Sequence, residues 1–519
     1  MSWQEEVDEL NRRVALAKEM GGRAGVERQH TNGRYTVRER IDLLLDYGSF
    51  HEIGALAGQP QYEGDKLVSF LPSNFVMGTG KIDGRRVVVG GDDFTVRGGA
   101  ADAVVGNKAG YGELLAREYR IPIVRLVDGT GGGGSVKVLE RMQRTYVPAN
   151  PSWDIIVALL SEVPVVGACL GPVAGLGAAR VAASHFSVMV KGTSQLFVAG
   201  PPVVERGVGE VVSKDDLGGS HIHAHGSGAV DNEVDTEDEA FAAIRTFLSY
   251  LPSNVWQLPP RSTPADDTYR KEEELLWIIP RDRKLGYDVR RLLRFVLDRD
   301  SLFEVGRYYG RPVVCALARI NGYAVGVLAS DPHKCGGGLD APACEKMIRF
   351  VDLCDTFHVP VVNFVDQPGF VIGTAAEKAG TIRLGVRALS AVYQASVPWV
   401  SIILRRVFGV AGAGHGKAQG LNLRYAWPSG DWGSLPIEGG VQAAYRREIE
   451  SSSDPDELRR QIEERLNTFR SPFRTAEAFG IEEIIDPRDT RQILCEWVES
   501  AYELLKTRPL GLTQRGCRP

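Results

Sequence analysis

Short apolar runs alternate with longer segments of helical periodicity along most of the chain. The clearest apolar run is 361–365, which is rich in β-branched residues and is followed by a Gly/Pro turn at 366–370. Such a run is typical of a strand that is covered on both faces of a parallel sheet. The carboxyl end of such a strand is a common place for a ligand. We therefore expect a functional site at this turn.

The same order of residues occurs twice in the chain. The stretch 121–131 repeats 359–369, with apolar residues around a proline, then a Val-Asp pair and a glycine turn. Three further matches follow the same order, at an offset of roughly 240–250 residues, which is far too long for a solenoid repeat. These matches pair 45–52 with 297–304, 82–84 with 320–322, and 163–166 with 397–400. The sequence therefore predicts two copies of one α/β domain in tandem.

The periodicity predicts the elements of the first copy and its limits. We expect helices at 3–20, 109–119 and 153–162, a helix that begins with a capping box at Thr36 and Glu39, and strands at 87–90, 121–127 and 163–169. A further helix is expected to start from the glycine turn in 171–180. This alternation indicates a mostly parallel sheet with crossover helices.

Prolines and charged residues at 252–285 indicate a connector between the two copies. We therefore expect domains at 1–258 and 286–519, with a solvated helix after 453.

The composition narrows the class of protein. The 519 residues are 43% hydrophobic and 24% charged, with a net charge of −5, which is ordinary for a soluble globular protein and gives no reason to expect nucleic acid or an acidic membrane as a partner. The seven cysteines show no CxxC spacing, as expected in a reducing compartment. No signal region and no membrane-length apolar run occurs. We expect a cytoplasmic protein.

The 59 glycines cluster at strand ends, and these clusters are the main chemical feature. Turns at 129–134 and 171–177 follow strands of the first copy, and turns at 366–370 and 409–416 follow strands of the second. A helix that starts at such a turn points free amides outward, and two converging amides can hold an oxyanion. Two copies would supply two oxyanion holes. Glycines also permit tight strand–helix packing, and spacing alone does not decide between these interpretations.

Histidines offer a weaker signal. His221, His223 and His225 alternate on a possible strand and would share a face, but no cysteine or carboxylate set accompanies them, so loop or structural histidines are favoured and no metal site is expected. His415 and Lys417 lie in a glycine turn, where a ligand contact and a solvated loop are equally plausible. No P-loop, HExxH, dinucleotide fingerprint or GxSxG stands out. Catalysis by backbone dipoles therefore becomes more attractive than a side-chain triad.

Several motifs together are specific for one family. They are the segments 36–41 (TVRERI), 45–50 (LDYGSF), 93–99 (DFTVRGG), 217–223 (LGGSHIH) with 227–228, 349–355 (RFVDLCD), 365–374 (VDQPGFVIGT) and 425–428 (YAWP). The chain resembles the carboxyltransferase (β) subunit of biotin-dependent acyl-CoA carboxylases, the propionyl-CoA and methylcrotonyl-CoA carboxylase family, over nearly its whole length. The resemblance implies an α/β fold of two tandem crotonase-like (ββα superhelix) domains, with acyl-CoA on the side of the first and biotin on the side of the second.

The resemblance also implies a reaction and its residues. Carboxybiotin on a carrier protein loses CO2, the biotin anion takes the α-proton of the acyl-CoA, and the enolate attacks CO2, so no side-chain base is needed. The implied acyl-CoA hole is formed by Thr130, Gly131 and Gly132 with Ala174 and Gly175. The implied biotin hole is formed by Gly369 and Phe370 with Gly409, Val410 and Ala411. Further substrate contacts are implied at Gly98, Gly99, Ala413 and His415.

The chain departs from the family pattern at both turns. Thr130 stands where a glycine is common, and no acidic residue occurs near Ala413, as in the methylcrotonyl type, which favours a larger or branched acyl group. No ATP-grasp region and no Ala-Met-Lys-Met biotin site occurs, so biotin carboxylase and biotin carboxyl carrier subunits are implied as partners, with an obligate dimer unit and usually a hexamer. The alternatives are a biotin-independent or decarboxylating relative and a non-catalytic assembly subunit.

Overall fold

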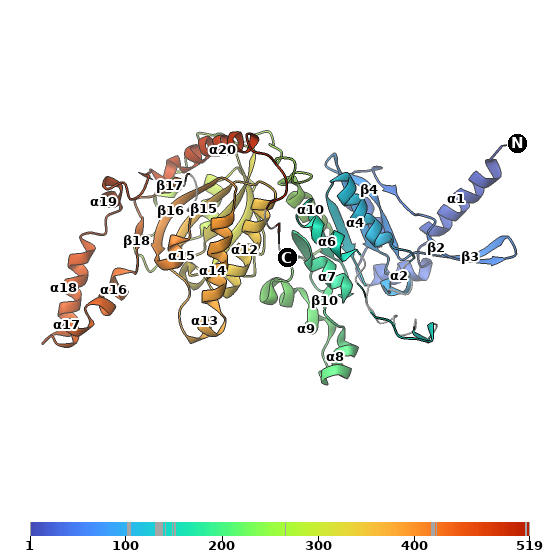
Figure 1. Cartoon of the computed structure of the whole chain (residues 1–519), viewed down its shortest axis with the longest axis horizontal. Helices are drawn as coiled ribbons and strands as arrows, with labels where there is room; N and C mark the ends of the chain where they lie inside the picture. The colour runs from blue at the N-terminus through green and yellow to red at the C-terminus, as the bar shows by residue number, and fades with distance from the viewer. Residues whose placement is uncertain are drawn as a thin grey trace. The chain divides into compact units, whose positions relative to one another are not determined.

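The computed structural model describes residues 2–100, 105–129, 139–140, 142–147, 149, 152–264, 266–416, 421, 423–513 and 516–517. The chain forms two compact units (Figure 1). The first comprises Met1–Gln257 with Leu510–Pro519, and the second comprises Leu258–Pro509. The segment that follows residue 257 therefore packs with the second unit, whose core includes the buried Leu275.

The first unit is built on a seven-stranded sheet in the order β1-β4-β5-β6-β7-β9-β11. The strands β1, β4 and β5 are antiparallel, and from β5 onward all neighbours are parallel. The sheet strands are β1 (His51–Glu52), β4 (Phe75–Ile82), β5 (Arg85–Asp92), β6 (Ile123–Val127), β7 (Val165–Cys169), β9 (Phe186–Val190) and β11 (Asn232–Val234). Two small two-stranded sheets pair β2 (Gly58–Glu63) with β3 (Lys66–Pro72) and β8 (Pro172–Ala174) with β10 (Gln195–Phe197).

The first unit contains the five expected helices and further helices that were not predicted. In chain order, they are α1 (Gln4–Lys18), α2 (Arg23–Thr31), α3 (Val37–Leu44), α4 (Lys108–Tyr119), α6 (Trp153–Leu159), α7 (Leu176–Ala182), α8 (Pro201–Val208), α9 (Lys214–Gly218) and α10 (Glu237–Ser249). The expected helices are α1, α3, α4, α6 and α7. The capping box at α3 is confirmed, because Thr36 and Glu39 satisfy each other's backbone amides. The helix expected to start from the glycine turn in 171–180 is α7, which begins after Gly175, and the short strand β8, paired with β10, precedes it.

The second unit repeats this topology in the order β12-β13-β14-β15-β16-β17-β19, with β18 beside β16. The strands are β12 (Phe303–Glu304), β13 (Val313–Ile320), β14 (Tyr323–Ser330), β15 (Val361–Gln367), β16 (Trp399–Phe408), β17 (Leu423–Ala426), β18 (Asp431–Gly433) and β19 (Glu483–Ile484). The helices are α11 (Val289–Val296), α12 (Ala341–Thr356), α13 (Thr374–Lys378), α14 (Thr381–Gln394), α15 (Gly409–Ala413), α16 (Ile437–Ala444), α17 (Arg446–Glu450), α18 (Pro455–Asn467), α19 (Pro472–Glu477) and α20 (Thr490–Lys506).

One face of the second sheet packs on α11 and α20, and the other packs on α12. Figure 1 labels α20 and α12 beside this sheet. Alternate residues of a strand point to opposite faces, so Val325 and Val327 join the core with α11 and α20, whereas Gly326 lies against Phe350 of α12. The tail helix α18 is mostly exposed, as expected, but Ile462 is buried with Val441 and Ile449.

Equivalent hydrogen bonds in the two units confirm the duplication. The carboxylate of Asp46 accepts the amides of Asp83 and Gly84 in the β4–β5 turn, at 3.0 and 2.8 Å. In the second unit, Asp298 accepts the amides of Asn321 and Gly322 in the β13–β14 turn, at 3.1 and 2.8 Å. The two matched hairpins predicted from the sequence are therefore present and are held by the same contact.

Candidate functional site

In each unit, a buried aspartate lies where the central parallel strand ends. In the first unit, Asp128 follows β6 and is fully buried. Its two oxygens accept hydrogen bonds from Arg34 at 2.9 Å and from Arg40 at 2.7 Å. A Cβ on Gly171 would lie only 1.9 Å from one of these oxygens, so the turn after β7 needs a glycine here. This ion cluster fixes the ends of β6 and β7 against each other.

The second unit anchors the matching aspartate with different residues. Asp366 on β15 is also fully buried and accepts from Arg405 at 2.9 Å and from Arg406 at 2.6 Å, both on β16. Burial alone would raise the pKa of Asp366, but hydrogen bonds and positive charge from Arg406 and Arg405 hold it below its ordinary value. Arg406 also donates to the carbonyl of Gly336 at 2.6 Å, which ties a second glycine turn to the same strand end.

The structure places part of the implied acyl-CoA hole. Thr130, Gly131 and Gly132 lie outside the described residues. Gly129, directly before them, has a φ of 100°, and a Cβ there would lie 2.6 Å from the carbonyl of Gly98. The turn after β6 therefore lies against the Gly98–Gly99 turn.

The remaining members of this hole follow β8. Ala174 ends β8, and Gly175 precedes α7 with a φ of 61°. The Gly175 amide donates to the carbonyl of Phe197 at 3.2 Å, so this N–H is already used within the fold.

The implied biotin turns lie side by side in the second unit. Gln367 of β15 pairs with Val407 of β16, so the turns after these two strands start from the same level of the sheet. Gly369 has a φ of 129°, and a Cβ built on it would have one near atom, the carbonyl oxygen of Phe408 at 4.0 Å. Phe370 pairs with Leu339 in an isolated bridge, and Gly409, Val410 and Ala411 form the first turn of α15.

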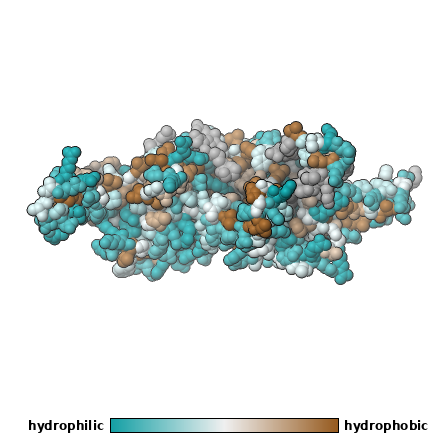
Figure 2. All heavy atoms as spheres, turned by 90° about the horizontal axis from the view of Figure 1, so that it is seen from below, coloured by the Kyte–Doolittle hydropathy of each residue, from teal (hydrophilic) through white to brown (hydrophobic). Residues whose placement is uncertain are grey.

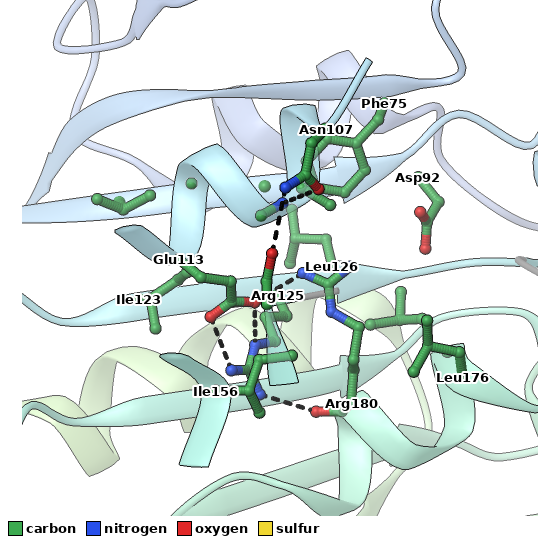
Figure 3. Close-up of a pocket in the computed structure, with 18 of the residues that line it drawn as sticks. Phe75, Asp92, Asn107, Glu113, Ile123, Arg125, Leu126, Ile156, Leu176 and Arg180 are labelled. Atoms are coloured by element: carbon green, nitrogen blue, oxygen red, sulfur yellow. Dashed lines mark hydrogen bonds and ion pairs between the residues drawn. The ribbon is translucent and has the colours of Figure 1, made fainter. Parts of the chain in front are cut away.

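A cavity of about 350 Å³ lies inside the first unit between β5, β6 and the helices α4, α6 and α7 (Figure 3). Gly99, Gly175, Leu176 and Gly177 line it at the strand-end turns, and Val88 and Ile123 line it further along the sheet. Most of its wall is apolar, including Phe75, Ile156 and Leu126. The cavity therefore leads away from the turns where the acyl-CoA was expected.

Charged side chains form one wall of this cavity. Glu113 of α4 binds Arg125 of β6 at 2.8 Å and Arg180 of α7 at 2.6 Å (Figure 3). Burial alone would raise the pKa of Glu113, but Arg125 and Arg180 lower it below its ordinary value. Asp92 lines the cavity separately and accepts the amide of Asp128 at 3.1 Å. Complete burial raises the pKa of the Asp92 carboxyl group to about 7, although the charge of Arg180 opposes this shift.

The remaining predicted contacts differ in their surroundings. Ala413 is exposed, whereas the carbonyl of His415 accepts from Asn363, Trp399 and Ser401 within 3.0 Å. Burial lowers the pKa of the His415 imidazole. His415 is thus built into the fold, and Lys417 lies outside the described residues.

The three histidines at 221–225 do not lie on a strand. They fall in a π-helix, His221–Ser227, where His223 binds the carbonyl of Leu196 at 2.8 Å and His225 binds Glu233 at 3.0 Å. Within the described part of the chain, no group of three or more His, Cys, Asp or Glu side chains is placed to hold a metal ion.

Sequence reasoning missed three features of the site. The Gly336–Gly337 turn is equivalent to Gly98–Gly99, and the repeat offset applied to 98–99 would have found it. Asp92 and Arg180 carry no sequence signal, because only the fold brings them to one cavity.

Comparisons with known proteins agree with this geometry. Residues 28–514 match the family model described as the carboxyl transferase domain. The chain belongs to the carboxyl transferase family. It is 35% identical to the carboxyltransferase subunit of propionyl-CoA carboxylase from Haloferax mediterranei, with 98% of each chain covered. It is 32% identical to methylmalonyl-CoA decarboxylase subunit alpha from Veillonella parvula, with 94% of each covered.

A solved structure shows the same fold over the full length. One chain of the transcarboxylase 12S hexamer, solved with methylmalonyl-CoA and methylmalonic acid bound, superposes on this chain with a TM-score of 0.85 at 31% identity and 97% coverage of each chain. The resemblance stated from the sequence and the fold of two tandem crotonase-like domains are thus confirmed. The chain is a carboxyltransferase of the biotin-dependent acyl-CoA carboxylase family, with biotin as the cofactor and acyl-CoA as the substrate class.

Proposed function

We propose that this chain moves CO2 from carboxybiotin, held on a separate carrier protein, to the α (or vinylogous γ) carbon of an acyl-CoA. The first domain, 1–258, would bind the acyl-CoA, and the second, 286–519, would bind biotin. The observation that carries this proposal is the pair of matched strand-end sites, each built on a buried aspartate and bordered by glycine turns. Two such sites suit a reaction that has two oxyanions to stabilise.

We assign the biotin ureido group to the turns at 369–370 and 409–411. The Cα of Gly369 faces open space, and the first amides of α15 have no intrahelical acceptor. Biotin supplies a CO2 group that is released on the enzyme and a ureido anion that can accept a proton. The amides of Phe370, Gly409, Val410 and Ala411 would hold the ureido oxygen in this anion.

The acyl-CoA side would stabilise an enolate. The amides of the turn at 130–132 would donate to the thioester oxygen, together with those at 174–175. Because the Gly175 amide already donates to Phe197, we place more of this role on the turn after Gly129. Donors that are already oriented towards the oxygen cost no reorganisation when charge develops on it.

We further propose that the chain works with biotin carboxylase and biotin carboxyl carrier subunits, and that it forms a dimer unit within a hexamer. Figure 2 shows a mostly hydrophilic surface interrupted by apolar patches. Exposed apolar side chains occur around α8, at Val198, Val203 and Val208, and near α14, at Ile382 and Val386. Clustered exposed apolar residues favour contacts with other chains. No helix in the described ranges is long and apolar enough to cross a membrane.

The cysteines support a cytoplasmic location. All seven are free thiols, and Cys335 is exposed. Exposed free thiols persist in reducing compartments.

Decarboxylation is the alternative, and two observations favour it. The Veillonella parvula relative is named as a decarboxylase subunit. Asp92, a carboxyl group that changes protonation near neutral pH, lines the same cavity as Gly99 and Gly175 and could return a proton to an enolate. In that reaction a malonyl-type thioester would lose CO2, and the enolate would take up a proton.

The test is carboxylation of a panel of acyl-CoAs by the chain with a biotinylated carrier and its biotin carboxylase, with the chain alone as the control. Incorporation of CO2 that requires the carrier supports the proposal. Val410→Pro removes one amide of the biotin turn and should lower kcat about 100- to 1000-fold, whereas Val410→Ala keeps this amide and should not. Carrier-independent CO2 release from malonyl-type thioesters, without incorporation, would favour the alternative.

A further inference from the structure

The cavity of the first unit is best understood by comparison with the second unit. From 98 to 128 the two copies align at a constant offset of 238 residues. Gly98 and Gly336 have φ values of 63° and 61°, and Arg120 and His358 have φ values of 51° and 57°. Asp128 and Asp366 follow at the same offset. Helix α4 can therefore be compared with α12 residue by residue.

At four positions, small residues line the cavity where the second unit has large ones, and at one position the order is reversed, since Val88 corresponds to Gly326. Gly90, Ala109, Gly110 and Gly112 line it in the first unit, and the equivalent residues are Leu328, Met347, Ile348 and Phe350. All four large residues are buried. Phe350 packs on β14, where a Cβ on Gly326 would lie 3.4 Å from its ring. The second unit thus fills the space between its helix and sheet.

Part of the space in the first unit is taken up by other side chains. A Cβ on Gly90 would lie 2.8 Å from the ring of Phe75, and one on Gly110 would lie 2.2 Å from Ser152. Gly112 differs, because its nearest neighbours would be Met77 at 3.7 Å and Val88 at 3.9 Å, which is ordinary contact distance. A glycine inside a helix costs about 1 kcal/mol relative to alanine, so a glycine with room for a side chain suggests that the space has another use.

Resting on the proposed function, we infer that this cavity binds the acyl chain of the substrate, and that the substrate is a medium-chain, apolar acyl-CoA. Gly99 and Gly175, beside the turns that would hold the thioester, line one part of the cavity, and residues of β5 and β6 line the rest of it. A protein cavity of about 150 Å³ holds benzene, with six carbon atoms, so about 350 Å³ has room for an acyl chain of roughly six to ten carbons. A propionyl group would leave most of it empty.

The charged side chains that line the cavity are compatible with an apolar acyl chain. Glu113 pairs with Arg125 and Arg180, and Arg125 also donates to the carbonyl of Ala183 at 2.6 Å. Most of their hydrogen-bonding groups are therefore directed to each other and to the backbone. The buried Nε of Arg180 has no hydrogen-bond partner among the described residues. The methylene groups of a chain would replace void or weakly held water against Phe75, Ile156 and Leu126.

The test measures binding without turnover. S-alkyl-CoA thioethers from propyl to dodecyl are titrated calorimetrically into the full-length protein without a carrier. We expect affinity to rise up to about fourfold for each added methylene, at least tenfold in total from propyl to octyl, and to level off beyond about ten carbons. Equal affinity for propyl and octyl would overturn the inference.

Two variants test whether the acyl chain binds in this cavity. Gly112→Phe introduces the residue of the second unit and should weaken octyl-CoA binding at least tenfold, while propyl-CoA binding stays within twofold and reports correct folding. Leu114→Phe, on the same helix but half exposed and not lining the cavity, is the matched control and should change neither. Octyl-CoA binding unaffected by Gly112→Phe would contradict the assignment.

Failure of this inference is distinguishable from failure of the proposed function. Carrier-dependent carboxylation with an optimum at propionyl-CoA and flat thioether affinities would overturn the chain-length inference and leave the function intact. The reverse result, chain-length-dependent binding without carboxylation, would overturn only the function.

Discussion

The two units share a topology but solve the same local problem with different residues. Asp128 is held by Arg34 and Arg40, which come from the segment before and within α3, whereas Asp366 is held by Arg405 and Arg406 of the adjacent strand β16. What the copies retain is a buried carboxylate with two guanidinium partners at the end of the central strand. The source of the arginines differs between them. The electrostatic requirement of the strand end is thus retained, and the residues that meet it are not.

At the ends of β5 and β14, the same comparison distinguishes a hydrogen bond that both units make from a carboxyl group that only the first unit has. Ser330 accepts the amide of Asp366 at 3.2 Å, as Asp92 accepts the amide of Asp128. A hydroxyl group is therefore sufficient for this structural contact. The carboxyl group of Asp92 and the cavity beside it are features of the first unit that the shared fold does not require.

The largest expected effect comes from removing the strand-end charges. Asp128→Asn and Asp366→Asn should each lower the free energy of unfolding of their own unit by about 3–5 kcal/mol, because buried guanidinium groups lose their partner. Arg40 keeps Glu237 at 2.7 Å, so the first unit should lose less than the second. Calorimetry with hydrogen exchange would assign the loss to a unit.

The control for this prediction is Glu503→Gln, which removes an exposed partner of Lys506 and should leave unfolding almost unchanged. Equal losses in the two units would show that Glu237 does not compensate. A loss below 1 kcal/mol in both would contradict the role assigned to the buried aspartates.

A smaller, pH-dependent effect is expected at Asp92. Its pKa is raised to about 7 by burial, so between about pH 4 and pH 7 the folded protein holds a proton that the unfolded chain releases. Stability therefore falls as pH rises through this window, and the loss is complete above pH 7. Asp92→Asn keeps an acceptor for the Asp128 amide and removes the charge. Its Tm should exceed that of the wild type at pH 8, by roughly 2–4 °C for each kcal/mol recovered, and should approach it near pH 4.

Asp92→Ser tests the same point by introducing the residue of the second unit. It should remove the pH dependence as Asp92→Asn does, at some cost from the added void. A pH profile of Tm that is the same in wild type and both variants would show that Asp92 stays ionised in the folded protein.

The sequence predicted the duplication and most elements because these depend on local patterns. The capping box at Thr36, the hairpins at 82–84 and 320–322 and the strand at 361–365 follow from periodicity and turn chemistry. The π-helix at 221–227 was not predicted: alternating histidines indicated only a possible strand, and loop or structural histidines were favoured. The Asp92–Arg180 cavity was not predictable, because its residues come from separate elements whose packing decides the distance between them.

The smallest expected effect is at the helix that each unit places before its first sheet strand. Thr36 accepts the amide of Glu39 at 3.3 Å, and Glu39 returns a bond to the Thr36 amide at 2.7 Å. In the second unit, Asp288 alone accepts the amides of Arg290 and Arg291, at 2.9 and 3.1 Å. Thr36→Ala and Asp288→Ala should each cost about 1 kcal/mol, measured by denaturant unfolding.

Conservative substitutions at the two N-cap residues make this comparison more specific. Thr36→Ser and Asp288→Asn keep an oxygen acceptor at the cap and should cost only a few tenths of a kcal/mol. Glu39→Ala should weaken only the first unit, because it removes the reciprocal bond of the capping box at α3. Helix α11 is capped by Asp288 alone and has no such reciprocal bond. If Glu39→Ala proved neutral while Thr36→Ala did not, the two helices would be capped by one side chain each, and the capping box would add nothing to the first unit.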